Sequence, residues 1–407
     1  MSSEYVGEVI AEVQGLYGPV TIAEILVQKL WYRQEFSRRD LRTRAGKSLI
    51  IHHPGRWNRL GGPDFKGAEW EIDGQRRIGD VEIHFYQRDW FAHGHETNPA
   101  FNDVGLHVVV FDPDPDERPA FTQNASSPAL LVLAPQLDAS LEEVAWREAM
   151  RLLDGGDPLD LAAPLLALPV NERRAHLIAG AHRRWNHKLH FARRRLETEG
   201  WRATCHQVAL EILGYRANRQ AMADLAVRHP LEDWRGVDLD WIEQRLEEGA
   251  WSYQGIRPAN HPRRRLEQYR LLVCHNPRWP ERLAEFLISW STPGRWEEGS
   301  RPFRQQAQLG NWRRKLQNEV FGGQLGSPRL DTLVIDGILP LAAARWGSQH
   351  YSAAWFHWFP GDLPDKLRVF LRVAGLSDAV FPVCNGMQQG ALDCLYTRDA
   401  AQILPAG

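Results

Sequence analysis

Apolar and polar residues alternate from Arg77 to Phe85, which is the pattern of a strand with one buried face. Successive side chains of a strand point to opposite faces, so residues two apart share a face. The apolar face is formed by Val81, Ile83 and Phe85. Glu82 and His84 therefore point together to the other face, where a carboxylate and an imidazole lie side by side.

A second predicted strand precedes this one, and Asp73-Gly74 separates the two. An Asp-Gly pair between strands favours a two-residue hairpin turn. The hairpin returns the chain, so Asp64, at the start of the first strand, comes near Glu82 in the second. The pattern predicts two carboxylates that converge beside His84.

The elements that flank this hairpin follow from similar patterns. The run Thr21-Ile22-Ala23-Glu24 has the form of a capping box, and apolar residues at helical spacing extend the helix to about Phe36. Apolar runs predict strands over 48–52 and 106–111, and an edge strand over 129–133. The N-terminal part of the chain therefore mixes one helix with several strands.

The segment between the Glu82 strand and the strand over 106–111 predicts a crossover. A short or irregular helix starts at Asp89, because Gly94 and Pro99 interrupt any longer helix. A crossover of this kind implies that the strand over 106–111 lies parallel to an earlier strand.

Helical periodicity dominates the chain after Leu137. A second capping box begins at Ser140, and we place the domain boundary near Leu137. This predicts an α/β domain over residues 1–137 and a mostly α-helical domain over 138–407. The predicted helices cover 141–153, 172–197, 202–213, 219–228, 240–247, 263–273, 280–290 and 365–373.

The composition is that of an ordinary globular protein. The 407 residues are 43% hydrophobic and 25% charged, with a formal net charge of −2. The N-terminal stretch lacks the layout of a signal peptide, and no apolar run approaches membrane-spanning length. The 4 cysteines are scattered without a C-x-x-C spacing, which argues against a zinc ribbon or a disulfide scaffold. We expect a cytoplasmic protein without membrane contact.

The converging carboxylates suggest a metal site. Asp64 and Glu82 can hold a hard divalent cation, Mg or Mn, and leave positions for water. Each residue taken singly is more often a turn residue or part of a solvated strand face. The order of all of them together favours the metal site, with Asp64, Glu82 and His84 as catalytic residues.

The order Pro63-Asp64 and then Glu82-Ile83-His84 resembles the core of the PD-(D/E)XK nuclease superfamily, with histidine in place of the usual lysine. The resemblance implies a restriction-endonuclease-like core in the N-terminal domain. It also implies that the carbonyl of Ile83 completes the protein ligands and that His84 orients or activates the attacking water. Neutral imidazole can accept a proton near pH 7, although the same replacement would also fit an inactive site.

Over nearly its full length the chain also resembles an uncharacterised bacterial family, domain of unknown function 2851. The stretches that carry this resemblance are GPDF, GDVEIH, DWFAHGH, LHVVV, LGYRANRQAM, RPANHPRRRL and GMQQGAL. This resemblance implies no activity.

Histidines near the hairpin provide an alternative metal site. His93-Gly94-His95 in extended form places two imidazoles on one side, and Glu82 and His84 could complete a shell for Zn or Fe. His107 lies within an apolar run, where a hydrogen-bonded core histidine is the more common case.

Glu24 is a further candidate at this site. Its position in the capping box favours a bond back to the start of the helix over a reach into the site. Both roles stay open from the sequence.

Cations are concentrated in two places. The predicted helix over 172–197 carries Arg183, Arg184, Lys188 and Arg194, and a second cluster contains Arg257 and Arg263. In a nearly neutral protein such an excess suggests a phosphate-binding surface, although some of these cations must pair with acids of the protein. The expected partner is nucleic acid.

These observations lead to three hypotheses. The first is a metal-dependent phosphodiesterase, a nuclease acting on nucleic acid. The second is a histidine-metal hydrolase or oxygenase acting on a small molecule. The third is a non-catalytic nucleic-acid-binding protein.

Overall fold

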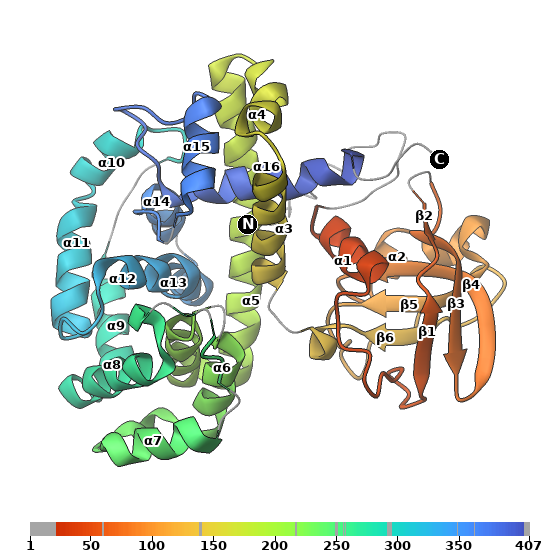
Figure 1. Cartoon of the computed structure of the whole chain (residues 1–407), viewed down its shortest axis with the longest axis horizontal. Coiled ribbons are helices and arrows are strands. Elements are labelled where there is room, and N and C mark those ends of the chain that lie inside the picture. Colours follow the sequence, from red (N-terminus) through yellow and green to blue (C-terminus); the bar gives the residue numbers. More distant parts are fainter. Residues whose placement is uncertain are drawn as a thin grey trace, which may run out of the picture. The chain divides into compact units, whose positions relative to one another are not determined.

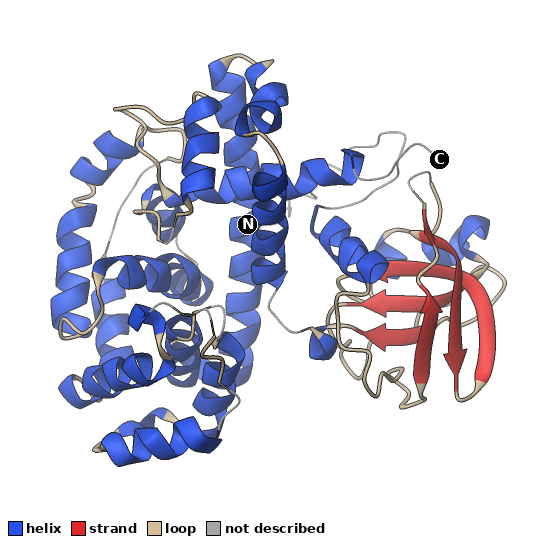
Figure 2. Cartoon of the chain, viewed as in Figure 1, coloured by secondary structure: helices blue, strands red, loops and turns tan. Residues whose placement is uncertain are grey.

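The structure, a computed structural model, describes residues 22–402 except 59–60, 138–140, 216–217, 249–250, 255, 257, 291–294, 348 and 362. The chain forms two compact units. The first ends at Ala145 and includes a short C-terminal stretch from Ala400, and the second runs from Trp146 to Asp399. The first combines a curled sheet with helices, and the second is largely helical (Figures 1 and 2). The boundary predicted near Leu137 stays a prediction.

The first unit is built on a six-stranded mixed sheet. Its strands are β1 (Leu49–His53), β2 (Arg56–Trp57), β3 (Phe65–Ile72), β4 (Gln75–His84), β5 (Val104–Val109) and β6 (Ala129–Val132). The order is β1-β3-β4-β5-β6, and β2 pairs with β3. The pairs β4–β5 and β5–β6 are parallel, whereas β1–β3 and β3–β4 are antiparallel. The prediction that the strand over 106–111 lies parallel to an earlier strand is confirmed.

The hairpin between β3 and β4 has the predicted turn. Asp73 and Gly74 both have positive φ, 49° and 81°, as a two-residue turn of the I′ type requires. The turn sets the antiparallel pairing of the two strands, in which Phe65 lies opposite Val81. Asp64 therefore lies beside the second half of β4.

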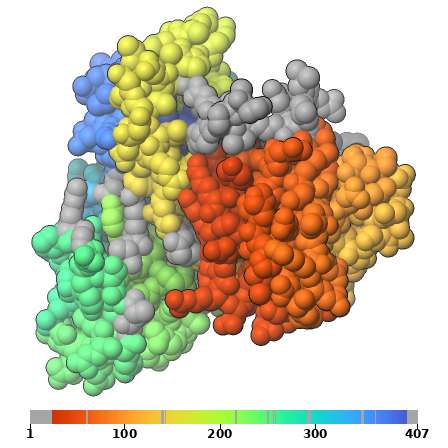
Figure 3. All heavy atoms as spheres, turned by 45° about the vertical axis from the view of Figure 1, so that its right-hand side comes forward, coloured from red at the N-terminus to blue at the C-terminus, as the bar shows by residue number. Residues whose placement is uncertain are grey.

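Helix α1 (Ile22–Arg33) packs on the apolar face of β4. Val27 and Trp31 are buried in one cluster with Val81 and Ile83, which are 0% and 1% exposed. The helix ends three residues before the predicted end at Phe36. The predicted cap residue Thr21 lies outside the described residues. On the face drawn in Figure 3, the segments from α1 to β6, coloured red to light orange, pack into one continuous surface.

The crossover from β4 to β5 is short and irregular, as predicted. It consists of α2 (Asp89–Ala92) and two 3-10 turns, η1 (His95–Thr97) and η2 (Pro99–Phe101). Trp90 and Phe101 are buried in a small apolar cluster with Val104. This cluster holds the crossover against the sheet.

The second part of the chain is helical. The α-helices are α3 (Leu141–Gly155), α4 (Pro158–Leu166), α5 (Val170–Leu213), α6 (Arg219–Arg228), α7 (Leu239–Glu248), α8 (Pro262–His275), α9 (Trp279–Ile288), α10 (Ser300–Gln306), α11 (Leu309–Lys315), α12 (Ser327–Leu333), α13 (Leu339–Trp346), α14 (Gln349–His357), α15 (Asp365–Val373) and α16 (Asn385–Gln402). Short 3-10 turns are η3 (Ala134–Gln136), η4 (Leu231–Trp234) and η5 (Pro258–Asn260), and π-helical turns are η6 (Leu316–Val320) and η7 (Val334–Ile338). None of the described helices combines the length and apolar character that crossing a membrane requires.

All eight predicted helices of this part are present. Two of the unpredicted ones, α12 and α13, share a cause. Helices α12 and α13 join through the π-helical turn η7, and nearly every side chain from Leu330 to Ala343 is buried. A helix that is apolar all round lacks the polar face that makes helical periodicity visible. The two helices predicted over 172–197 and 202–213 correspond to α5, which has a kink at Gly200 with φ 74°.

A buried histidine links α5 to its neighbours. His206 is 1% exposed. Its Nε2–H donates to the carbonyl of His229 at 2.9 Å, so its Nδ1 accepts the hydroxyl of Tyr269. Burial, partly offset by backbone carbonyls, lowers the pKa of His206 to about 4.

We predict that His206 makes the second unit less stable in acid. The unfolded chain takes up a proton near pH 6.5 and the folded chain only near 4, so stability is complete above 6.5 and falls as pH decreases towards 4. A shift of this size corresponds to about 3 kcal/mol in the free energy of unfolding. Denaturant unfolding of wild type and His206→Gln from pH 7.5 to 4.5 tests it. A wild-type slope that the variant does not reduce would contradict the assignment.

Candidate metal centre

Asp64 and Glu82 are tied together by reciprocal hydrogen bonds. The amide of Asp64 donates to Glu82 Oε2 at 3.0 Å, and the amide of Ile83 donates to Asp64 Oδ2 at 3.0 Å. Both carboxylates are buried, at 8% and 6% exposure. The predicted convergence of the two carboxylates is confirmed, whereas their role as ligands stays a prediction. The group of Ile83 that meets Asp64 is its amide, not the carbonyl that the nuclease resemblance implied as a ligand.

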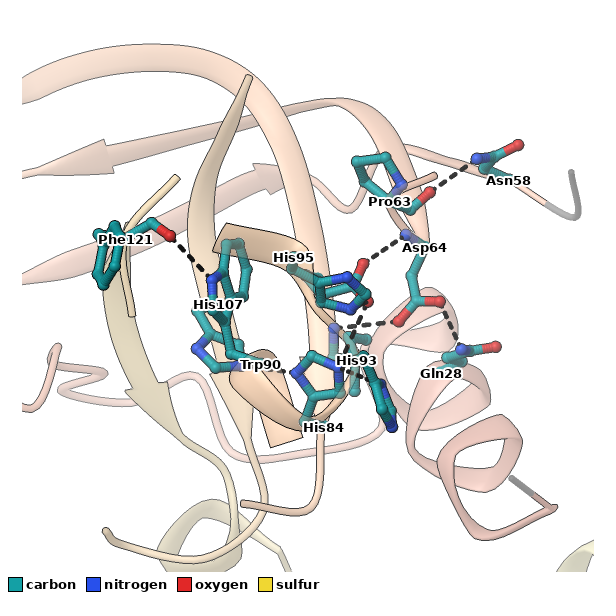
Figure 4. Close-up of polar contacts among 12 residues, drawn as sticks. Gln28, Asn58, Pro63, Asp64, His84, Trp90, His93, His95, His107 and Phe121 are labelled. Carbon is teal, nitrogen blue, oxygen red and sulfur yellow. Dashed lines mark hydrogen bonds and ion pairs between the residues drawn. The ribbon is translucent and has the colours of Figure 1, made fainter. Parts of the chain in front are cut away.

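Helix α1 supplies further polar groups to this site (Figure 4). Gln28 Nε2 donates to Asp64 Oδ1 at 2.6 Å, and Trp57 Nε1 donates to Gln28 Oε1 at 3.2 Å. Glu24 lies one helical turn before Gln28 and is 5% exposed. Its charge acts on Glu82, so Glu24 lies near the site. Its capping role stays a prediction, because Thr21 lies outside the described residues.

The carboxylates repel one another. Burial, and then the charge of Glu82, raise the pKa of Asp64 well above its usual value. Burial raises the pKa of Glu82 as well; the amide of Asp64 opposes this and the charge of Glu24 adds to it. Without a cation, these groups must hold protons or bear repulsion. A cation between them would favour their charged forms.

Two histidines lie beside Glu82 Oε1, and a third lies beside one of them. His84 Nε2 lies 3.5 Å and His95 Nε2 3.1 Å from this oxygen. His84 Nε2 lies 3.2 Å from His93 Nδ1. One ligand nitrogen from each histidine lies within 4.8 Å of the others. Four ligands about 2.0–2.1 Å from a zinc ion would be roughly 3.3–3.4 Å apart at tetrahedral angles. The separations of 3.5, 3.1 and 3.2 Å given above are close to this value.

The crossover reaches this geometry in a conformation that the sequence did not predict. His93 is the helical C-cap of α2 and His95 begins η1, so the segment is not extended as expected. Between them Gly94 adopts the left-handed conformation, with φ 70°. A residue without Cβ allows this reversal of the chain, which turns both imidazoles to the same centre.

His95 is buried without a hydrogen bond. It is 5% exposed, and neither ring nitrogen has a hydrogen-bond partner among the described residues. Burial lowers its pKa to about 4, so the ring is neutral at pH 7 and offers a lone pair. Leaving a buried polar group unsatisfied costs about 1–3 kcal/mol. An unsatisfied buried group of this kind needs an explanation, and an ion bound to the ring would provide one.

His84 is held from behind by His107. His84 Nδ1 lies 2.9 Å from His107 Nε2, and His107 is fully buried. Metal-binding histidines usually form such a bond through the nitrogen that does not bind the ion. Burial, and then the neighbouring imidazoles, lower the pKa of His84. In the neutral ring one nitrogen carries a proton and the other offers a lone pair. The expectation of a hydrogen-bonded core histidine at position 107 is confirmed.

One group of predicted site residues lies at this centre. The structure brings together Glu24, Asp64, Glu82, His84, His93 and His95. Sequence reasoning missed Gln28, although it lies four residues after Glu24 and thus on the same helix face. It also missed the bond from His107 to His84, which depends on the pairing of β4 with β5.

Two of the cations expected to bind nucleic acid are buried and have partners inside the second unit. Arg184 and Lys188 are buried and donate to Gln389 and Asp336, so the expectation of an exposed phosphate-binding surface is wrong for both. A folded helix buries the face that packs on its neighbours, and periodicity did not identify that face.

The remaining cations give a mixed result. Arg183 pairs with Asp393 at 2.6 Å, and Arg263 contacts Glu243 and Glu267. Arg194 is exposed, and Arg257 lies outside the described residues. The phosphate-binding role of these residues stays a prediction.

Replacing Glu82 with Gln should raise the stability of the metal-free protein. Gln keeps an oxygen for the amide of Asp64, and its amide group can donate to His95 Nε2. The change also removes a buried like charge. We expect a gain on the order of 1 kcal/mol, measured by thermal melting in a chelator-treated buffer. Glu71→Gln, at a half-buried site on β3 outside the metal centre, is the control. A melting temperature below that of wild type would contradict this account.

Comparison with known proteins identifies a family. The family model with the description "Protein of unknown function (DUF2851)" matches residues 24–240, which is more than half of the chain. The match includes every residue of the candidate metal centre. No curated protein and no solved structure was found to match. The chain belongs to the family described as Protein of unknown function (DUF2851).

Proposed function

We propose that the first unit is a metal-dependent hydrolase whose metal ion is bound by Glu82, His84, His93 and His95. The observation that carries this proposal is the state of His95. It is a buried neutral imidazole with no hydrogen bond to any residue that the structure describes, and its Nε2 lies 3.1 Å from a buried carboxylate oxygen. An ion bound to both groups would satisfy them.

The donor set favours zinc or iron. Imidazole is a preferred ligand of both, whereas magnesium prefers oxygen ligands. The expectation of Mg or Mn at Asp64 and Glu82 alone therefore takes second place. Asp64 already accepts two hydrogen bonds, from Gln28 and Ile83, and is better suited to a role beside the ion.

The chemistry of the site divides between the ion and the protein. When bound, the ion would supply Lewis-acid polarisation of substrate and water. Asp64 would accept the proton of the attacking water, because burial raises the pKa of its carboxyl above the usual value and so makes it a stronger base. His84 would bind rather than act as the base, since its Nδ1 contacts His107 and its Nε2 faces Glu82.

A phosphodiester is the substrate class that we propose second. Three carboxylates lie near one another: Glu24 of α1, Asp64 just before β3, and Glu82 of β4, the strand that pairs in parallel with β5. This arrangement supports the resemblance to the PD-(D/E)XK core, in which clustered carboxylates hold hard cations against phosphate. The paired cations of α5 give this substrate no support.

The metal site predicts that His95→Ala weakens metal binding. Loss of a supporting partner behind a ligand typically costs 10–100-fold in metal affinity, so loss of a ligand should cost about 100-fold or more. The full chain is loaded with Zn, Fe(II) or Mn and analysed by elemental analysis and competition with a chelating dye. His52→Ala, an exposed histidine of β1, is the control and should bind like wild type.

Two results would contradict the site. One is unchanged zinc affinity in His95→Ala. The other is the absence of stoichiometric binding by any of the three metals in wild type.

The hydrolase proposal predicts that Asp64→Asn loses at least about 100-fold in rate while it still binds metal, which is the usual range for a general base. The assay uses the metal-loaded full chain with an activated carboxylic ester, a phosphodiester, and single-stranded and duplex DNA and RNA. Asp80→Asn, on the facing strand β4 but outside the site, is the control. Cleavage of phosphodiesters alone would favour the second candidate. No cleavage of any substrate by loaded wild type would count against catalysis.

A further inference from the structure

A pocket of about 420 Å³ lies in the first unit, apart from the metal centre. It is lined by residues that precede β1, by the loop before β6 and by parts of β4 and β5. None of the four proposed metal ligands lines it. Its volume lies within the range of sites for small molecules.

The pocket carries an excess of positive charge. Arg44, Lys47 and Arg77 line it, together with a single carboxylate, Glu117. Arg44 is engaged by Asp112 at 2.7 Å. The side chains of Lys47 and Arg77 have no ion pair among the described residues. Two cations are therefore available to an anion that enters the pocket.

Two buried atoms of the lining residues lack hydrogen-bond partners. His107 is 0% exposed, and its Nδ1 has no partner within the described chain, whereas its Nε2 contacts His84. The atom Glu117 Oε1 is also buried, and it too has no hydrogen-bond partner among the described residues. Buried polar atoms are usually paired, so both atoms indicate a polar ligand. Glu117 can only accept, which requires a donor group on that ligand.

We propose that this pocket binds a small molecule that carries an oxyanion next to hydroxyl groups. Lys47 and Arg77 contact the oxyanion, which is a phosphate or a carboxylate. His107 Nδ1 and Glu117 Oε1 bond the hydroxyl groups. The site is independent of the proposed hydrolase activity, since it requires no metal ion and shares only the contact between His107 and His84.

Calorimetric titration of the full chain, freed of metal by chelation and dialysis, tests the proposal. The probes are inorganic phosphate, glycerol phosphate and citrate, with glycerol as the uncharged control. We expect glycerol phosphate or citrate to bind more tightly than inorganic phosphate, and glycerol not to bind. The preferred probe distinguishes a phosphate from a carboxylate ligand. Lys47→Gln and Arg77→Gln should each weaken binding by about tenfold or more, the loss expected for a charge-assisted hydrogen bond.

Arg76→Gln is the matched control, because Arg76 is exposed on the same strand and does not line the pocket. Its affinity for the preferred probe should equal that of wild type. Equal affinity in the variants of Lys47, Arg77 and Arg76 would overturn the proposal. Absence of binding by all three anionic probes at millimolar concentration would overturn it as well. Failure of this experiment leaves the metal site unaffected, since no step depends on a metal ion.

Discussion

The burial of acidic and imidazole groups with few partners is the constraint on which the first unit depends. Asp64 and Glu82 are almost inaccessible to water, yet they lie close enough to repel each other. Their reciprocal bonds to the backbone of the facing strand hold them in place despite this repulsion. Marginal stability leaves little room for such an arrangement unless it serves a purpose. The proposed binding of a cation would account for both the carboxylates and the neutral histidines.

The sheet and the crossover contribute different parts of this site. The paired strands β3 and β4 place the carboxylates through a rigid hydrogen-bonded ladder. The crossover places His93 and His95 through a short turn that Trp90 and Phe101 anchor in an apolar cluster. Sites built on regular elements are positioned more accurately than sites on loops. Here the buried side chains of Trp90 and Phe101 compensate for the irregular backbone, because their packing restricts the motion of the crossover.

His107 connects two features of the first unit. One ring nitrogen contacts His84 in the candidate metal centre, and the residue also lines the cationic pocket.

In the second unit, several cations are engaged inside the fold. Those of α5 pair with acids and amides of α16 and of the π-helical turn η7, as with Arg183 and Asp393. Charge that was expected on a binding surface thus contributes to the internal structure of the helical unit.

The sequence by itself determined the local geometry around Glu82. Strand alternation placed Glu82 and His84 on one face, and the Asp73-Gly74 pair specified the turn, because both properties depend on a few neighbouring residues. Only the tertiary structure decided that α1 brings Glu24 to the site and that Arg184 and Lys188 of α5 face inward. These outcomes depend on packing between elements far apart in the chain, where many small contacts compete and no local pattern reports the result.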